Sequence, residues 1–259
     1  MSVIQQYLSK SKSIIETISR QEKEIATAAA WFAKTILSGR MVHVFGSGHS
    51  RIMVEEMWPR YGSFPGFNPI VELSLTFHNL VVGANGQRQA MFLENVPGLA
   101  ERILRNFDIK PEDSALVISS SGCNVVPIEI AELFQKQKVK VVSIITQQHS
   151  SQSTSKRLDG KKLGNFSDLI LDTGAPNGDA MIAIPGLDTL VAPGSTLGGV
   201  LIINSIKAEV ARLLTEAGSP PLVLSSASVV GKEKAIELFE AAYDEHANRL
   251  AKLYLNIGK

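Results

Sequence analysis

The sequence predicts an α/β fold, a three-layer α/β/α sandwich around a five-stranded parallel sheet. Two observations predict it. Short runs rich in β-branched residues alternate with stretches of helical spacing, and strands that alternate with helices are typical of a parallel sheet covered on both faces. With 259 residues, 44% of them hydrophobic, the chain can bury one sizeable core. The predicted strands are 41–45, 69–74, 114–119, 139–146 and 168–173.

Helical spacing of apolar residues frames these strands. Residues 3–37 place apolar side chains at intervals of three and four, which predicts two helices, or one bent helix, before the first strand. Within this stretch, Ser19-Arg20-Gln21-Glu22 resembles a capping box. The same spacing predicts two long helices near the end of the chain, at Ser195–Leu214 and Lys232–Tyr254.

Two segments lack this periodicity. Residues 147–165 are rich in Ser, Gln, Thr and Lys, which favours a solvated loop over a lid on a substrate. Residues 174–179 read Gly-Ala-Pro-Asn-Gly-Asp and predict successive turns. Neither segment resembles a linker between domains. We therefore expect a single domain over residues 1–259, made of an N-terminal helical arm (1–38), a sheet core (41–214) and a C-terminal helix (231–254).

Charge balance and cysteine content exclude several classes of protein. Lys and Arg total 26 against 25 Asp and Glu, so the net charge of +1 is too small to indicate binding to nucleic acid or an anionic membrane. The longest apolar run, near 197–206, is about half the length that spans a bilayer. The single cysteine, Cys123, permits no internal disulfide, and the N-terminus lacks the apolar region of a signal peptide. We expect a cytoplasmic protein that binds neither nucleic acid nor membranes.

The first predicted strand runs into a glycine-serine turn, Gly46-Ser47-Gly48-His49-Ser50. Because a helical segment follows, the backbone N–H groups of the turn and of the helix N-terminus would face an anion at the end of the strand. A nicotinamide site is disfavoured, since Arg51 replaces the third glycine of the dinucleotide fingerprint, although Glu72 stands near the position of a ribose-binding acid. The sequence contains neither a P-loop nor a nucleophile elbow.

A second turn repeats this arrangement. The strand at 114–119 leads into Ser119-Ser120-Ser121-Gly122-Cys123-Asn124, and Pro127 fits the first turn of a following helix. Hydroxyls and backbone amides can hold a phosphate without a lysine. One such turn alone is better explained as a tight connection, whereas the pair favours a phosphate ligand. Asn124 is then either a ligand contact or the cap of the helix.

The two motifs resemble the signatures of SIS (sugar isomerase) domains, a family that includes phosphoheptose isomerase, glucosamine-6-phosphate synthase and N-acetylmuramic acid 6-phosphate etherase. The resemblance covers about residues 41–214 and is strongest to bacterial SIS-domain proteins that read G-S-G-H-S followed by a Glu-Glu pair. It implies a five-stranded parallel sheet between helices, a small-molecule sugar phosphate as ligand, and assembly as a homodimer or homotetramer.

The resemblance also implies roles for individual residues. It gives a phosphate-site role to Ser50 from the first motif, and to Ser119, Ser120 and Ser121 from the second, with Asn124 in place of the family's threonine. Ser47, Gly48 and Gly122 complete the predicted phosphate- and sugar-binding residues through their places in the two turns.

Aldose-ketose isomerisation needs a general base beside a carbonyl and a group that relays protons between oxygens. Two carboxylates follow the first turn. Glu55 stands four residues after Arg51, where a surface ion pair explains it. Glu56 falls at the margin of the buried helix face, near the direction of His49. We predict Glu56 as the catalytic base and His49 as its polar neighbour; an exposed helix residue is the alternative for Glu56.

His246 falls inside the apolar stripe of the last predicted helix, and a histidine there needs a partner. It is either a hydrogen-bonded core or interface histidine, or a catalytic residue that reaches the sugar bound by a second subunit of a homodimer. His78 stands in an apolar context where a structural histidine is expected.

No HExxH or paired-cysteine spacing occurs, so we expect no metal and no cofactor. Two other functions stay open beside the isomerase. A sugar-phosphate lyase or etherase begins with the same proton abstraction. A non-catalytic phosphosugar sensor keeps the serine turns but needs no base.

Overall fold

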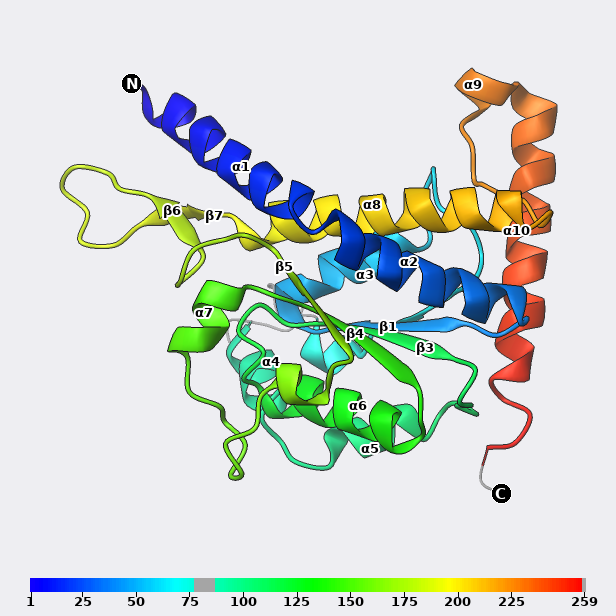
Figure 1. Cartoon of the computed structure of the whole chain (residues 1–259), viewed down its shortest axis with the longest axis horizontal. Coiled ribbons are helices and arrows are strands. Elements are labelled where there is room, and N and C mark those ends of the chain that lie inside the picture. Colours follow the sequence, from blue (N-terminus) through cyan, green and yellow to red (C-terminus); the bar gives the residue numbers. More distant parts are fainter. Residues whose placement is uncertain (77–86, 258–259) are drawn as a thin grey trace.

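The structure, a computed structural model, describes residues 1–76 and 87–257, and the predicted structural histidine His78 lies outside these residues. Five parallel strands form one sheet in the order β2-β1-β3-β4-β5 (Figure 1). The predicted α/β class and five-stranded parallel sheet are confirmed, although the second strand ends at Ile70 and not at Ser74 as predicted. The strands are β1 (Val42–Gly46), β2 (Phe67–Ile70), β3 (Ser114–Ile118), β4 (Lys140–Ile145) and β5 (Leu169–Asp172).

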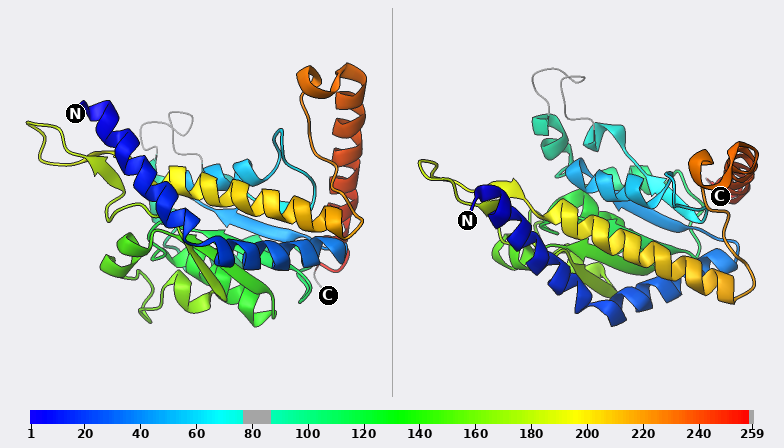
Figure 2. Two further views of the ribbon diagram at one scale, coloured as in Figure 1. Left: turned by 45° about the horizontal axis from the view of Figure 1, so that its top comes forward. Right: turned by 90° about the horizontal axis from the view of Figure 1, so that it is seen from above.

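Helices cover both faces of the sheet (Figures 1 and 2). One face is covered by α1 (Val3–Ser19), α2 (Glu22–Leu37), α3 (Arg51–Met57) and α8 (Ser195–Glu216). The opposite face is covered by α5 (Leu99–Leu104) and α6 (Val125–Lys136). The shorter α4 (Gln87–Leu93) lies beside the turn after β1, and α7 (Gln147–Gln152) follows β4. Finally, α9 (Ala227–Val230) and α10 (Lys232–Lys252) lie at the end of the molecule away from α7.

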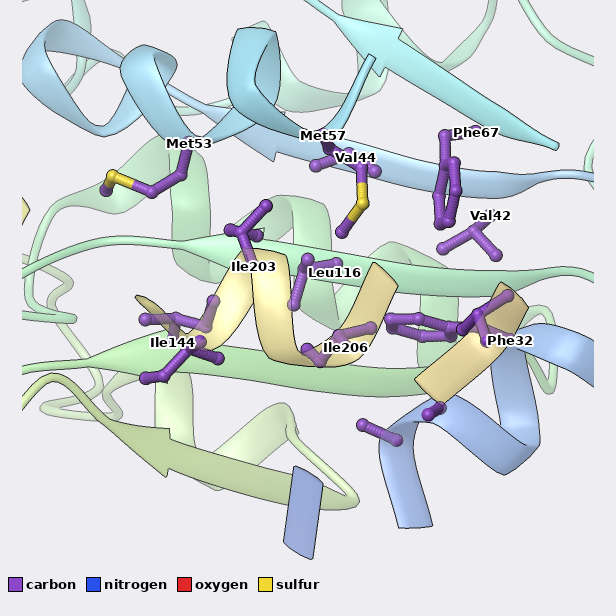
Figure 3. Packing of buried hydrophobic residues seen from close by; sticks show 14 of the residues in the cluster. Phe32, Val42, Val44, Met53, Met57, Phe67, Leu116, Ile144, Ile203 and Ile206 are labelled. Carbon is purple, nitrogen blue, oxygen red and sulfur yellow. The ribbon is translucent and has the colours of Figure 1, made fainter. Parts of the chain in front are cut away.

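The core is divided between the two faces of the sheet because successive strand residues point in opposite directions. Val44 packs on the side of α2, α3 and α8, whereas its neighbour Phe45 packs on the side of α5 and α6. Figure 3 shows the first of these layers, in which side chains from the sheet meet Phe32 of α2, Met53 of α3 and Ile203 of α8. Burial on both faces explains why the strands are apolar along their whole length.

Three local features differ from the prediction. The capping box at Ser19 does not form, because the Ser19 hydroxyl donates to the carbonyl of Ile15 at 2.9 Å. The segment at 147–165, predicted as a loop, begins with α7. An antiparallel pair, β6 (Ala180–Ile182) and β7 (Val191–Pro193), forms a hairpin that the sequence did not indicate. The hairpin projects from the body of the molecule next to the start of α8 (Figure 1).

A buried polar cluster closes the amino edge of the sheet. His43 in β1 accepts a hydrogen bond at Nδ1 from Asn68, at 2.9 Å, so its Nε2–H donates to Asp113, at 3.2 Å. Arg40 donates to both oxygens of the same carboxylate, at 2.7 and 2.8 Å. Burial raises the pKa of Asp113, but the hydrogen bonds from His43 and Arg40 lower it by more. The net effect is a lowered pKa, so the carboxylate stays ionised and paired. His43 is therefore a structural residue.

Helix α8 crosses one face of the sheet and packs closely on the end of β5. It is 22 residues long, and none of the described helices is long and apolar enough to cross a membrane. A Cβ atom on Gly198 would lie 2.0 Å from the carbonyl oxygen of Thr173, so only glycine permits this approach. The contact sets the distance between the first turn of α8 and the carboxyl edge of the sheet.

Gly198→Ala should therefore destabilise the protein. Alanine favours a helix by up to about 1 kcal/mol over glycine, but overpacking a tight site costs about 1–3 kcal/mol, and the overlap with Thr173 involves backbone atoms that cannot move aside cheaply. Urea denaturation should show a lower free energy of unfolding for this variant. Ser205→Ala, on the exposed side of the same helix, should stay within about 0.5 kcal/mol of the wild type. Unchanged or higher stability of Gly198→Ala would contradict the close contact.

Candidate functional site

The two serine-rich turns lie next to each other at the carboxyl edge of the sheet. After β1 the chain adds β2 on one side of it, and then returns to add β3 on the other side. The strand order therefore reverses between β1 and β3, and such a reversal opens a crevice where α/β proteins bind ligands. Gly46, the last residue of β1, is paired with Ile118, the last residue of β3. The turns that follow these two residues face the same crevice.

The turn after β1 folds back sharply on itself. A Cβ atom on Gly46 would lie 2.6 Å from the carbonyl oxygen of Ser50, so the turn requires glycine at this position. The chain continues through a 3₁₀ turn at Gly48–Ser50, in which the Ser50 N–H donates to the carbonyl of Ser47 at 3.0 Å. Ser47 is buried, Gly48 and Ser50 are half-buried and His49 is exposed. The turn thus presents backbone and short polar side chains, with little bulk.

The turn after β3 is fixed by its own hydroxyl groups. The Ser119 hydroxyl accepts a hydrogen bond from the Gly122 N–H at 3.3 Å, and the Ser121 hydroxyl accepts one from the Cys123 N–H at 3.2 Å. A hydroxyl that accepts in this way keeps its O–H for donation to another group. Gly122 has the positive φ of 63° that this turn needs. Ser119 and Ser121 can therefore both donate to an anion.

A line of hydroxyls extends from this turn along the edge of the sheet. Ser120 shares a hydrogen bond of 3.1 Å with Thr146, which follows β4, and Thr146 shares one of 2.7 Å with Thr173, which follows β5. Both threonines are buried. The three residues connect the carboxyl ends of β3, β4 and β5 by polar contacts.

A cavity of about 380 Å³ lies between the two turns. Its lining includes the predicted residues Ser47, Gly48, His49, Ser50, Ser119, Ser120, Ser121 and Asn124, together with Thr173, Asp179, Ser195 and Thr196. The structure thus brings together every predicted phosphate-site residue except Gly122, which is buried within the second turn and supplies its conformation. None of the described residues that line the cavity is Lys or Arg.

Glu94 is a cavity residue that the sequence did not single out. It follows α4, is buried, and accepts a hydrogen bond from the side-chain amide of Asn124. Its backbone carbonyl accepts from the Val126 N–H at 2.9 Å. Glu94 Oε1 lies 3.5 Å from where a Cβ on Gly48 would be, so this carboxylate reaches both turns. Asn124 begins α6 without a side-chain capping bond, so capping does not explain it.

Two more unpredicted residues line the cavity at the side of α8. The Asp179 carboxylate accepts from the Gly194 N–H at 3.0 Å and from the Ser195 N–H and hydroxyl at 2.7 and 2.8 Å. Nδ1 of His149 in α7 lies 3.0 Å from the Gly178 N and 2.9 Å from the Asn177 Oδ1, so the turn that precedes Asp179 holds this ring in place. The signal for His149 was present in the sequence, since it follows the strand 139–146 at the same edge as the serine turns.

Glu56 does not line this cavity. The prediction that its side chain lies near the direction of His49, at the serine turns, is therefore corrected. Its carboxylate accepts hydrogen bonds from Arg60, four residues along the chain, and from Asn204 of α8, at 2.8 Å. Burial raises the pKa of Glu56, but the bonds from Asn204 and Arg60 lower it more, so the group is held as a carboxylate. It borders a different groove, together with Tyr61 and Tyr243. Nothing in this arrangement supports Glu56 as a base at the serine turns.

His246 also lies away from the cavity of its own chain. Its ring packs against Trp58, with centroids 5.1 Å apart, and its Nδ1 is buried with no hydrogen-bond partner among the described residues. The expected hydrogen-bonded histidine is therefore not observed at Nδ1. Burial, and next the positive charge of Arg249, lower the pKa of His246 despite the nearby Glu245. Its predicted role at a second subunit's sugar stays a prediction.

Cysteine and metal chemistry find little support among the described residues. Cys123 is buried, and burial raises the pKa of its thiol, which disfavours the reactive thiolate. In the described ranges 1–76 and 87–257, no group of three or more His, Cys, Asp or Glu side chains could hold a metal ion.

Comparison with known proteins agrees with this architecture. The SIS domain model matches residues 6–146, more than half of the chain. The chain belongs to the SIS family. It is similar along 98% of its length to a UPF0309 protein of Listeria monocytogenes serotype 4b, with 31% identity over all of that protein, and along 95% to a UPF0309 protein of Oceanobacillus iheyensis, with 32% identity over 98% of that protein.

A solved structure supports the fold. A phosphoheptose isomerase from Francisella tularensis superposes with a TM-score of 0.52 and 17% identity, over 81% of this chain and 96% of that one. This likeness, with the SIS model match, confirms the resemblance to the SIS family and its helix-flanked five-stranded parallel sheet.

The buried ring of His246, whose Nδ1 has no hydrogen-bond partner in the described part of the chain, predicts a pH dependence of stability. Because the pKa of His246 is lower in the folded protein than the ordinary value of about 6.5, the unfolded chain binds a proton there first as the pH falls, and the folded state loses stability below about pH 6.5. His246→Leu removes this loss. Urea denaturation at pH 8 and pH 5.5 should show that the free energy of unfolding of the variant, relative to that of the wild type, is higher at pH 5.5 than at pH 8. A stability difference that does not change with pH would contradict this account.

Proposed function

We propose that this protein binds a sugar monophosphate between its two serine turns and transfers a proton on the bound sugar, as a phosphosugar aldose-ketose isomerase does. The observation that carries the proposal is that both turns, which are separated by about seventy residues in the sequence, line one cavity at the strand-order reversal. Membership of the SIS family and a fold shared with a phosphoheptose isomerase support the same conclusion.

The phosphate would be held by hydroxyls and amides. Ser50, Ser119 and Ser121 line the cavity, and the last two have their O–H groups available for donation. The 12-residue helix α6 begins directly after the second turn, and its N-terminus adds partial positive charge beside the bound anion. This mode of binding needs no lysine or arginine, in agreement with the described lining of the cavity.

Glu94 is the proposed general base in place of Glu56. Its carboxylate lies at the cavity next to both turns, where carbon-bound protons of a sugar held by its phosphate would come within reach. Asn124 orients this carboxylate by donating to it. His49 and His149 line the same cavity, and either could relay protons between the oxygens of the substrate.

Two alternatives to isomerisation keep the same ligand. A lyase would use Glu94 for the same proton abstraction and then expel a substituent from the sugar. A sensor would bind the sugar phosphate without turnover, and Glu94 would then serve as a hydrogen-bond acceptor only. The position of Glu94 beside both turns favours an enzyme, since a carboxylate that lines the cavity can take a proton from a bound sugar and binding alone does not require a base there.

A homodimer is also proposed. Helix α1 leaves several large apolar side chains exposed, and a second copy that covers them would remove this surface from water. The exposed side chains are Val3, Ile4, Leu8 and Ile15.

A thermal-shift panel of free and phosphorylated sugars tests the ligand class. A ligand present at one hundred times its Kd stabilises the folded state by about 2.7 kcal/mol, which raises the melting temperature measurably. We expect sugar monophosphates to raise it and the matching free sugars not to do so. Equal shifts for both, or no shift for either, would contradict the proposed phosphate site. The sugar phosphate with the largest shift then serves as the substrate for turnover assays.

The turnover of that sugar phosphate should depend on Glu94. Glu94→Gln keeps the size of the side chain and the contact with Asn124 but removes the base, so kcat should fall by about 10²–10⁴-fold while the ligand still binds. Glu55→Gln, an exposed residue outside the cavity, is the matched control and should leave kcat unchanged. If Glu56→Gln abolishes turnover and Glu94→Gln does not, the original prediction of Glu56 is right and this proposal is wrong.

A further inference from the structure

The described lining of the cavity contains two carboxylates and no fixed positive charge. The two carboxylates are those of Glu94 and Asp179, and none of the described lining residues is Lys or Arg. The two carboxylates belong to different walls. Glu94 is attached to the serine turns through Asn124, whereas Asp179 is attached to the N-terminus of α8. The wall that bears Asp179 is therefore negative in its own right.

Asp179 occupies the place where a helix would otherwise attract an anion. The N-terminus of a long helix carries unpaired N–H groups and partial positive charge, which commonly bind phosphate or carboxylate ligands. Here the Asp179 carboxylate accepts the N–H groups of Gly194 and Ser195 and the Ser195 hydroxyl, at 2.7–3.0 Å. The start of α8 thus faces the cavity with its positive end already neutralised by a side chain.

The backbone at Asp179 is consistent with a carboxylate fixed in this position. Its φ of 69° lies in the left-handed region, which aspartate and asparagine tolerate better than most residues. Asp179 stands at the foot of the β6–β7 hairpin, directly before β6, and the hairpin returns to Gly194 directly after β7. The bonds to α8 therefore hold both ends of the hairpin together as well as placing the charge.

A histidine lies near this wall, but it is not paired with Asp179. His149 Nδ1 lies 3.0 Å from the Gly178 N and 2.9 Å from the Asn177 Oδ1, and no ion pair joins its ring to Asp179 among the described residues. The neighbouring groups that line the cavity, Ser195, Thr196 and Thr173, are uncharged hydroxyls. Neutral hydroxyl groups of a ligand can hydrogen-bond with all of these residues and can donate to Asp179.

We propose that Asp179 makes the cavity selective for sugars that carry a single anionic group, with the phosphate at the serine turns and a neutral polyol end toward α8. A second phosphate or a carboxylate at that end would face Asp179, and none of the described lining residues is a Lys or Arg that could balance the added charge. This inference rests on the proposed function, because it assigns an orientation to the sugar phosphate in the same cavity. Repulsion between the Asp179 carboxylate and the second anionic group of the ligand, in a partly buried cavity, would weaken binding of that ligand by about tenfold or more.

Two matched ligand pairs test the inference by isothermal titration calorimetry. The pairs are fructose 6-phosphate with fructose 1,6-bisphosphate, and glucose 6-phosphate with 6-phosphogluconate; in each pair the second ligand adds an anionic group at the end remote from the shared phosphate. The proteins are the wild type, Asp179→Asn, and Asp188→Asn as the matched control. Asp188 is an exposed residue in the loop of the same hairpin and does not line the cavity.

In the wild type, the ligand with one anionic group should bind at least about tenfold more tightly than its partner with two anionic groups. Asp179→Asn keeps the size of the side chain, an acceptor oxygen for α8 and tolerance of the left-handed φ, but removes the charge. The ratio of the two affinities should therefore narrow several-fold in this variant and stay as in the wild type in Asp188→Asn. If Asp179→Asn does not fold, Asp179→Gly removes the same charge at a position where glycine is unstrained.

The outcomes separate this inference from the proposed function. If the ligands with two anionic groups bind as tightly as those with one, the inference is wrong, but the proposed phosphate site is retained. If the wild type prefers the ligand with one anionic group and Asp179→Asn has the same affinity ratio, the larger ligand is excluded by its size. This result also contradicts the proposed role of the Asp179 charge. If none of the four ligands binds the wild type, the proposed function loses its support and the inference fails with it.

Discussion

The parallel pairing of β1 with β3 is the constraint on which the rest of the site depends. Because the strand order reverses between these two central strands, their last residues, Gly46 and Ile118, are held side by side. Two short turns that are far apart in the sequence then open onto one crevice. Gly46 permits the first turn to fold back on Ser50, and Gly122 gives the second its left-handed bend. The sheet thus supplies the position, and the turns supply the polar groups.

Helix α8 supplies the opposite wall of the cavity. It can approach the edge of the sheet only because Gly198 lies against the carbonyl of Thr173, and this approach brings Ser195 and Asp179 to face the serine turns. The two walls differ in the donors they offer: the serine turns present hydroxyl and N–H donors beside Glu94, whereas the N–H groups at the start of α8 already donate to Asp179. On the proposed function, this asymmetry would give a bound sugar phosphate one preferred orientation, with its anionic end at the turns.

The sequence predicts local features well and tertiary contacts poorly. The strands and both turns follow from short patterns that need no distant partner, so they are present at or near the predicted places, with β2 ending at Ile70 in place of Ser74. Glu56 was misplaced because α3 has only seven residues, and the direction of this side chain is decided by Asn204, far along the chain. Glu94 and Asp179 could not be recognised, since their partners, Asn124 and Ser195, lie in other elements. Strands of three residues, such as β6 and β7, are too short to leave a pattern.

A crystal structure of the protein with a bound sugar monophosphate tests the central claim most directly, because it locates the phosphorus atom. The account predicts density for the phosphate between Gly46–Ser50 and Ser119–Asn124, within hydrogen-bonding distance of the Ser50, Ser119 and Ser121 hydroxyls, and density for the sugar between Glu94 and Asp179. A phosphate at the N-terminus of α8, or a ligand in the groove beside Glu56, would contradict it.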